Sequence, residues 1–263
     1  MNTSIFSLLV LLLCLSGCAA TGKRSAIQPA ATTSSAAATS SAAGDDFGAS
    51  SVQKENDPFE PFNRTVFGFN DELNTHALRP LAHGYTVVVP LPVRNGITNF
   101  FDNLQFPVRF VNSVLQGKLT RSAQEAGKFV FNSTFGIGGL IRVSDHVSGL
   151  ANVPAEDFGL TLADWGFPAG PYLVIPVLGP SDCRDAVGFA GDYVISPLDW
   201  HTLGFIHTAY ISDAVSLGLS GARYLSGLPK ALDVYDQMKS GAIDPYIAVR
   251  NAYLSYRAAQ RKK

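Results

Sequence analysis

Charged side chains are scarce in this chain of 263 residues. Lys, Arg, Asp and Glu make up 16% of it, whereas about 25% is usual for a soluble globular protein. Phenylalanine, by contrast, is frequent, with 17 residues. The low charge indicates a surface that contacts something other than water. The formal net charge is −1 and no basic patch precedes the C-terminus, so nucleic acid is not expected as a partner.

Long hydrophobic runs are also few. The first, Ile5–Leu15, has eleven residues, and a transmembrane helix needs about 20. The run ends in Leu-Ser-Gly-Cys18, which resembles a bacterial lipobox with cleavage before Cys18. Residues 1–17 are therefore predicted to be a lipoprotein signal peptide and Cys18 the lipidated residue. An ordinary secretory signal peptide is the alternative, and residues 1–4 lack the usual Lys or Arg.

The signal sequence bears on the three cysteines. Cys14 would leave with the signal peptide and Cys18 would carry lipid, so Cys183 is expected to be a small buried side chain outside any intramolecular disulfide. Ala19 follows Cys18. By resemblance to enterobacterial lipoproteins, the absence of Asp there implies sorting to the outer membrane.

Large apolar residues are nearly absent from the next segment. Residues 18–56 consist mainly of Ala, Ser and Thr, a composition that cannot offset the entropy of ordering. They are predicted to be a disordered linker between the lipidated cysteine and a helical domain at 57–257. Residues 258–263 form a basic tail, which is usually a solvated end.

Motifs of catalysis are missing as well. The chain has no G-x-S-x-G elbow and no H-E-x-x-H pair, so it is predicted not to be an enzyme and to need no metal or cofactor. Gly136-Ile137-Gly138-Gly139 lacks the context of a nucleotide-binding loop; a helix C-cap, a hinge or a close backbone approach remain open. Asp199 and His201 flank Trp200 without a nearby nucleophile, and they would carry the alternative of a lipid hydrolase.

Helical spacing of apolar residues dominates the rest. Helices are predicted at 57–73, 94–104, 108–115 (after the interruption at Pro107), 122–135, 157–165, 203–228 and 246–261, with Pro229 and Gly241 as boundaries. Residues 172–175, between Gly170-Pro171 and Pro176, fit a buried strand. Trp165 and Trp200 could pack in the core or lie at a membrane interface.

The helix at 57–73 carries an unusual stripe of amides. Asp57 is expected to cap this helix and Pro58 to occupy its first turn. Asn63, Asn70 and Asn74 then align about 100° from an apolar stripe of Phe62, Val66, Phe69 and Leu73, and Phe67 lies just beyond the amides. Capping and helix–helix contacts are one explanation of the amides. Contacts to a polar ligand in an apolar path are the other.

Three motifs together resemble the MlaA (VacJ) family of outer-membrane phospholipid-transport lipoproteins. The first is DP-x4-NR-x5-N, the second NST-x-G-x-GG and the third a longer stretch from Glu156 to Asp185. Their positions are Asp57, Pro58, Asn63, Arg64 and Asn70; Asn132, Gly136, Gly138 and Gly139; and Glu156, Asp157, Gly170, Pro171, Gly179, Pro180, Arg184 and Asp185. The long linker departs from the family pattern. The family usually has an acidic residue soon after the second motif, whereas here Arg142 intervenes and Asp145 comes later.

The resemblance implies a mainly α-helical, ring-like domain embedded in the outer membrane, with Gly/Pro-rich irregular segments. Such a domain would hold an amphipathic channel, remove phospholipids from the outer leaflet and pass them to an MlaC-like periplasmic carrier, in association with a trimeric porin. Asn63, Phe67, Asn70 and Asn74 are our candidates for the lipid path. A peripheral lipoprotein that scaffolds envelope proteins is the main alternative, and the long linker favours it.

Overall fold

The computed structural model describes residues 57–199 and 213–263, with side chains from residue 218 onward in the second range. Residues 57–263 form a compact unit of their own. The signal peptide, Cys18, the linker, Trp200, His201 and the first ten residues of the helix expected at 203–228 lie outside the described residues.

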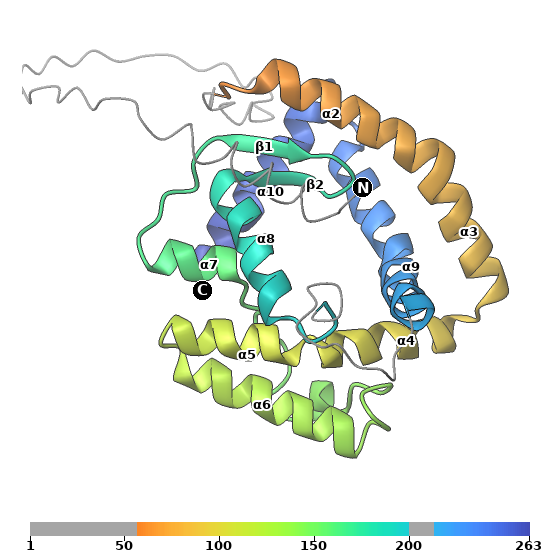
Figure 1. Ribbon diagram of the computed structural model, residues 1–263, viewed down its shortest axis with the longest axis vertical. Coiled ribbons are helices and arrows are strands. Elements are labelled where there is room, and N and C mark those ends of the chain that lie inside the picture. Colours follow the sequence, from red (N-terminus) through yellow and green to blue (C-terminus); the bar gives the residue numbers. More distant parts are fainter. Residues whose placement is uncertain (1–56, 200–212) are drawn as a thin grey trace, which may run out of the picture. The chain divides into compact units, whose positions relative to one another are not determined.

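The first helices form one curved arc (Figure 1). It consists of α2 (Glu60–Leu73), the π-helical turn η1 (Asn74–Leu78) and α3 (Arg79–Val88). Pro80 lies in the first turn of α3. Proline lacks an N–H and its ring collides with the carbonyl group one turn earlier, and a widened turn relieves both problems. The arc continues into α4 (Leu91–Leu104), which ends just before Pro107 and α5 (Phe106–Leu115).

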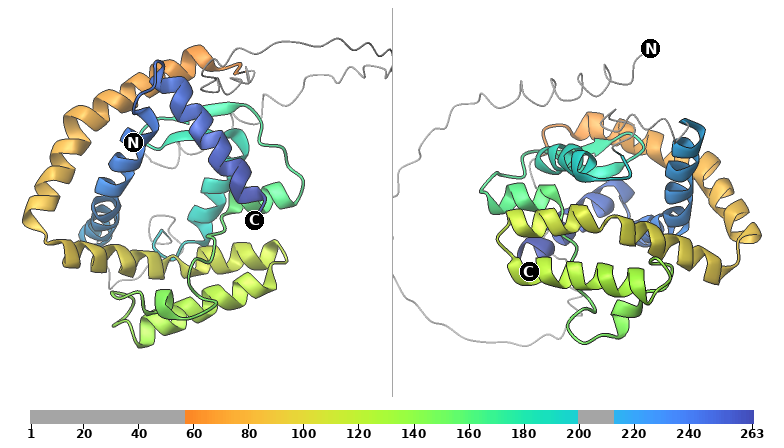
Figure 2. Two further views of the ribbon diagram at one scale, coloured as in Figure 1. Left: turned by 180° about the vertical axis from the view of Figure 1, so that it is seen from behind. Right: turned by 60° about the horizontal axis from the view of Figure 1, so that its bottom comes forward.

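The remaining elements complete a circuit with α4 and the arc (Figures 1 and 2). In chain order they are α6 (Leu119–Thr134), the 3-10 turn η2 (Val143–His146), α7 (Phe158–Asp164), the strands β1 (Tyr172–Ile175) and β2 (Gly179–Asp182), α8 (Cys183–Ile195), α9 (Asp213–Lys239) and α10 (Pro245–Arg261). The strands form an antiparallel hairpin in which Tyr172 is opposite Asp182. Figure 2 shows α10 lying along the far side of this hairpin.

The predicted mainly helical fold is confirmed, and two expectations about its elements are wrong. Helix α2 begins at Glu60, and Asp57 instead accepts a hydrogen bond from the backbone N–H of Phe59 at 3.2 Å. Pro229 lies inside α9. A proline inside a helix removes one backbone hydrogen bond, and α4 contacts this part of α9, with the Thr98 hydroxyl donating to the carbonyl of Ser226 at 3.2 Å.

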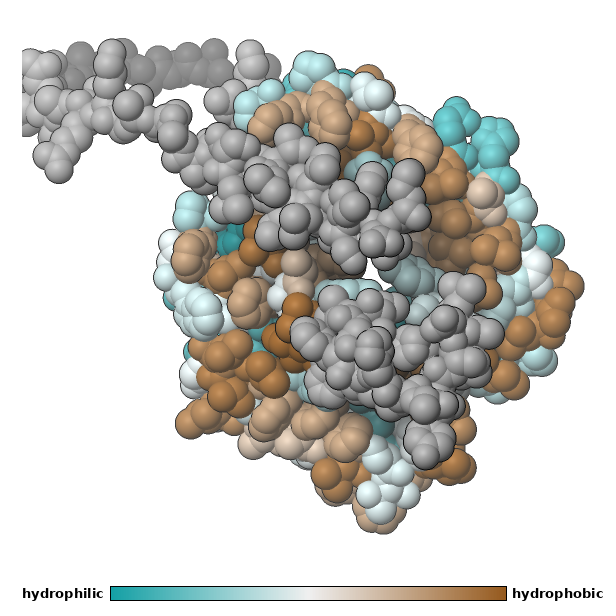
Figure 3. All heavy atoms as spheres, in the orientation of Figure 1, coloured by the Kyte–Doolittle hydropathy of each residue, from teal (hydrophilic) through white to brown (hydrophobic). Residues whose placement is uncertain are grey.

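Polar side chains are more common in the interior than apolar ones. Among the described residues, nine hydrophobic side chains are buried, and eighteen polar or charged ones are. Large apolar side chains are instead exposed at many positions, among them Phe62, Phe69, Val87, Val88, Leu91, Phe135, Ile137, Trp165 and Phe167. Figure 3 shows apolar patches on one face of the molecule. Within the described ranges, none of the helices combines the length and apolar character needed to cross a membrane.

Candidate functional site: the central cavity

A cavity of about 1460 Å³ lies between the elements of the circuit. Pockets for drug-sized ligands have roughly 300–1,000 Å³, so this cavity has room for a larger molecule. Its wall draws on α2, η1, α3, α4, α5, α6, the hairpin, α8, α9 and α10. The cavity is thus a property of the whole circuit.

The cavity wall mixes apolar side chains with neutral amides. The apolar part includes Leu73, Leu78, Leu81, Val174, Val177, Leu178, Phe189, Leu225, Leu228 and Val234, and the amides include Asn70, Asn74, Asn99, Asn103, Gln105 and Asn132. Several wall cations are paired with carboxylates: Arg109 with Glu125, Arg142 with Asp102 and Arg223 with Asp199. An amphipathic ligand would therefore meet apolar surface and weakly polar groups without a cluster of unpaired cations.

Two amides of α2 bind the backbone of β1 and of the turn that follows it. Asn63 donates to the carbonyl of Tyr172 at 3.0 Å and accepts from the N–H of Val174 at 2.9 Å. Asn70 does the same with Ile175 at 3.0 Å and Val177 at 2.8 Å. Seven helical residues rise about 10.5 Å and three strand residues about 10 Å. The two spacings match, so α2 acts as a hydrogen-bonding neighbour of the strand.

These contacts separate the four residues predicted for the lipid path. Phe67 and Asn74 lie on the cavity wall, and Asn70 does so too, although its side chain is buried and its amide is bonded to the backbone of Ile175 and Val177. Asn63 is completely buried, and its amide is bonded to β1 and to Asp57. The expectation that Asn63 lines the path is corrected: it is a core residue that holds the hairpin, through contacts to a strand instead of the capping or helix–helix contacts of the alternative explanation.

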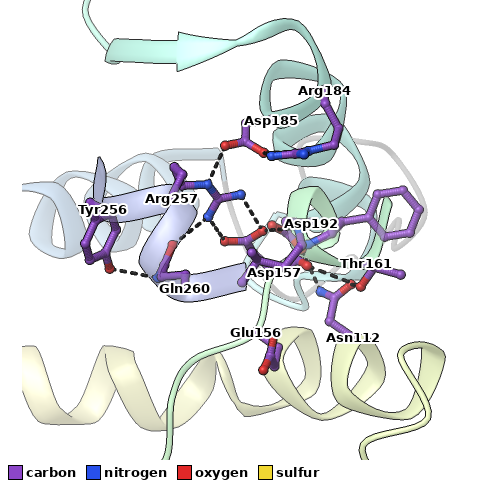
Figure 4. Close-up of polar contacts among 12 residues, drawn as sticks. Asn112, Glu156, Asp157, Thr161, Arg184, Asp185, Asp192, Tyr256, Arg257 and Gln260 are labelled. Carbon is purple, nitrogen blue, oxygen red and sulfur yellow. Dashed lines mark hydrogen bonds and ion pairs between the residues drawn. The ribbon is translucent and has the colours of Figure 1, made fainter. Parts of the chain in front are cut away.

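Motif residues of the third stretch form a polar cluster between α7, α8 and α10 (Figure 4). Arg257 donates to Asp157 at 2.7 Å and pairs with Asp185 at 2.5 Å. Burial alone would raise the pKa of Asp185, but hydrogen bonds from Arg257 and Tyr253 hold this pKa below its ordinary value. Arg184 is buried and pairs with Asp185 at 3.1 Å. The motif charges thus join three elements.

Asp57 and Arg64, from the first motif, join the start of the domain to its last helix. The Asp57 carboxylate accepts a hydrogen bond from the Tyr246 hydroxyl and lies 3.5 Å from Arg250. Arg64 pairs with Asp244 at 2.7 Å. Glu156, from the third motif, is buried and pairs with Arg121 and Lys118.

The second motif forms the turn after α6. Gly138 and Gly139 have φ values of +68° and +96°, and their N–H groups donate to Ser133 and Asn132. A Cβ at Gly139 would lie 2.6 Å from the side chain of Asn103, and one at Gly136 would collide with the carbonyls of Asn132 and Ile141. The geometry is that of a helix C-cap with close backbone approach. Gly170 and Gly179, of the third motif, also have left-handed φ values, +72° and +88°, which favour glycine.

Asp192 is a wall residue that the sequence reasoning did not single out. Its Oδ1 accepts from the Asn112 amide at 2.8 Å and from the N–H of Phe158 at 3.0 Å. Burial raises the pKa of Asp192 to about 7, although these hydrogen bonds act against the rise. The signal available in the sequence was one aspartate within AVGFAGDYVI, an otherwise uncharged helical segment.

Comparison with known proteins gives the family. The family model described as "MlaA lipoprotein" matches residues 55–260. The chain belongs to the MlaA lipoprotein family. The intermembrane phospholipid transport system lipoprotein MlaA of Escherichia coli K12 is 34% identical over 207 residues, 76% of each chain. The MlaA lipoprotein of Haemophilus influenzae is 30% identical over 203 residues, 77% of this chain and 78% of the relative.

A solved structure agrees with this MlaA assignment. It comes from work on the structural basis for maintenance of bacterial outer membrane lipid asymmetry. It matches with a TM-score of 0.62 and 33% sequence identity, covering 79% of this chain and all of the solved chain. An uncharacterised protein of Rickettsia typhi is 35% identical over 202 residues, 74% of each chain. The MlaA match spans nearly all of the residues whose structure is described.

Proposed function

We propose that this protein is an outer-membrane lipoprotein of a phospholipid-transport system that maintains lipid asymmetry. In this proposal Cys18 carries the lipid anchor, and the domain lies in the outer membrane with access to the periplasm. Phospholipids leave the outer leaflet through the central cavity and pass to an MlaC-like periplasmic carrier. A trimeric porin is the proposed neighbour in the membrane.

The central cavity is the observation that carries the proposal. Its volume of about 1460 Å³ suits a ligand larger than a typical metabolite, and its wall offers apolar surface beside neutral amides. Acyl chains require an apolar path, because transfer of apolar surface from water is favourable. Amides bind a phosphate less strongly than a cluster of cations would. A lipid can therefore enter such a cavity and leave it again.

The outer surface supports placement in the membrane. Contiguous exposed apolar surface marks membrane or protein contacts, and here Phe62, Phe69, Val87, Val88 and Leu91 follow one another along the arc and into α4. The relatives add support, since those of Escherichia coli and Haemophilus influenzae are named as lipoproteins of the intermembrane phospholipid transport system. The porin and the carrier are proposed from the family resemblance.

The transport role can be tested by filling the cavity. In cells lacking the gene, outer-leaflet phospholipid is measured after complementation with the wild type, Asn74→Trp or His76→Trp. Asn74 lies on the cavity wall, whereas the side chain of His76, two residues along η1, is 75% exposed. Clearance is expected to fail with Asn74→Trp and to persist with His76→Trp. Full clearance by both variants at equal expression would reject the cavity as the path.

A second experiment distinguishes an embedded domain from a tethered scaffold. The Cys18→Ala protein is exported with a cleavable signal peptide. The membranes of the expressing cells are then washed with carbonate, and the fraction of the domain that stays with them is measured. Retention of the domain is expected, because its exposed apolar surface would remain in the bilayer. Release as a stable soluble monomer would favour the scaffold.

A further inference from the structure

One face of α8 presents an acidic and aromatic set of side chains to the cavity. Phe189, Asp192 and Ser196 follow at intervals of three and four residues and all lie on the cavity wall. Residues at these spacings share one side of a helix. A ligand in the cavity would meet a ring, a carboxylate and a hydroxyl along a single line.

Among the residues whose side chains are described, the Asp192 carboxylate forms no ion pair with a cation. The Asn112 amide and the N–H of Phe158, both neutral donors, each bind its Oδ1. In the described part of the chain, the nearby Arg257 is engaged by Asp157 and Asp185. A partly buried carboxylate without a counter-ion is costly, as the raised pKa of Asp192 reflects. A cationic ligand group would offset that cost.

Ser196 provides an independent observation. Its side chain is 3% exposed, and its Oγ has no hydrogen-bond partner among the described residues. A buried hydroxyl without a partner costs free energy, and this one lies one turn from Asp192, bonded to it through the backbone at 2.9 Å. A ligand group with several N–H donors can satisfy the carboxylate and the hydroxyl together.

We propose that Asp192, Ser196 and Phe189 bind the primary ammonium group of a phospholipid headgroup, which makes ethanolamine-type lipids the preferred cargo of the cavity. The ammonium would donate to the Asp192 carboxylate and to Ser196, with the Phe189 ring beside it. Aromatic rings attract such cations, and charge-assisted hydrogen bonds are the strong ones. The inference rests on the proposed function, since it specifies the lipid.

The wall chemistry opposes a preference for anionic lipids. Arg109, Arg142 and Arg223 already have carboxylate partners, so an anionic headgroup would have to break those pairs. Of the wall cations, Lys230 has no such partner among the described residues, and it is exposed on α9. A zwitterionic headgroup keeps its phosphate near neutral amides while its ammonium meets Asp192.

The test is a lipid competition on the full-length protein in nanodiscs. Equal amounts of phosphatidylethanolamine and phosphatidylglycerol are offered, and the bound lipid is measured by native mass spectrometry. The wild type is expected to bind the ethanolamine lipid about tenfold better, and Asp192→Asn to remove that preference, as loss of one charge-assisted hydrogen bond would. Asp145→Asn is the matched control, because it removes an exposed wall carboxylate from η2.

The outcomes separate the two proposals. Equal binding of both lipids by the wild type would overturn the ammonium site and leave the transport proposal standing. Absence of any bound phospholipid would overturn both. Soluble glycerophosphoethanolamine is added in a further arm, and binding of this compound without any lipid would show a site for free amines instead. If Asp192→Asn does not fold, the wild-type competition and the Ser196→Ala variant still test the ammonium site. Ser196→Ala is expected to weaken the preference for the ethanolamine lipid.

Discussion

Asn63 and Asn74 are chemically identical side chains with different surroundings. Asn63 is fully buried and bonded to Tyr172 and Val174 of β1, whereas Asn74 lies on the cavity wall. Asn63→Leu is expected to lower the free energy of unfolding by about 2–4 kcal/mol, because two buried backbone groups lose their partners. Asn74→Leu is expected to change stability by less than about 1 kcal/mol and to slow lipid clearance.

Denaturant unfolding of the purified variants in detergent measures the first effect, and outer-leaflet phospholipid in complemented cells measures the second. Equal stability of Asn63→Leu and the wild type would contradict the role of this amide in holding the hairpin.

The pKa of Asp192 implies a pH dependence with a definite sign. Its folded-state pKa of about 7 lies above the ordinary value of 3.8, so the folded state binds the proton more tightly. The stability from this group is present at low pH and is lost as the pH rises from about 4 to about 7. Burial also raises the pKa of Asp182, to about 6, with the same sign.

Asp192→Asn is therefore expected to flatten the fall in stability between pH 5 and pH 7.5, leaving the part due to Asp182. Thermal unfolding at several pH values checks this expectation, with Asp145→Asn as the control on an exposed carboxylate. An unchanged slope would show that Asp192 titrates at its ordinary pKa in the folded protein.

Single residues were the hardest to predict from the sequence. The amide stripe on the first helix was visible from its spacing, yet spacing cannot show which face of a helix is buried when both faces carry apolar residues. Val66 and Asn63 are buried while Phe62 and Phe69 are exposed, the reverse of a soluble amphipathic helix. Asp192 was not predicted because a single carboxylate forms no spacing pattern that a sequence could reveal.

At the scale of elements, the turn after α6 depends on its glycines. Gly139→Ala is expected to cost at least about 2 kcal/mol, because it combines a left-handed φ with a clash against Asn103. Gly138→Ala has the same kind of φ and open space around the new methyl group, so about 1 kcal/mol is expected. Thermal unfolding of the two variants provides the comparison, and equal losses would rule out the close approach to Asn103.

Helix positions were largely predictable, and their boundaries and connections were not. The helices at 94–104, 122–135 and 246–261 are present as α4, α6 and α10 within a few residues. Helices α3 and α8 and the strand β2 were not predicted. Gly179-Pro180-Ser181-Asp182 reads as a turn because it lacks β-branched residues, and it becomes a strand through pairing with β1. Tertiary contacts decided these segments.

At the scale of the whole molecule, the distribution of apolar surface predicts lipid contact. Trp165 is 51% exposed and Phe167 is 56% exposed, and the indole N–H of Trp165 donates to the carbonyl of Leu115. In a Trp200→Phe protein, which keeps one of the two tryptophans, brominated phospholipids are expected to quench the fluorescence by about half or more, since indole favours the membrane interface.

Iodide in the aqueous phase serves as the opposite probe for the same Trp200→Phe protein. Strong quenching by iodide together with none by brominated lipid would place Trp165 in water and contradict membrane contact at this part of the surface.

The contacts that join Asp57 and Arg64 to α10 also constrain how the protein is made. Their partners Tyr246, Arg250 and Asp244 lie 180 or more residues later in the chain, and contacts of such long sequence separation form slowly. During synthesis from the N-terminus, Asp57 and Arg64 can pair locally with Phe59 and Glu60, but their contacts to α10 form only once the last helix exists. The nascent chain therefore remains open for nearly its whole length, and chaperones that shield apolar segments can act until the last helix closes the circuit.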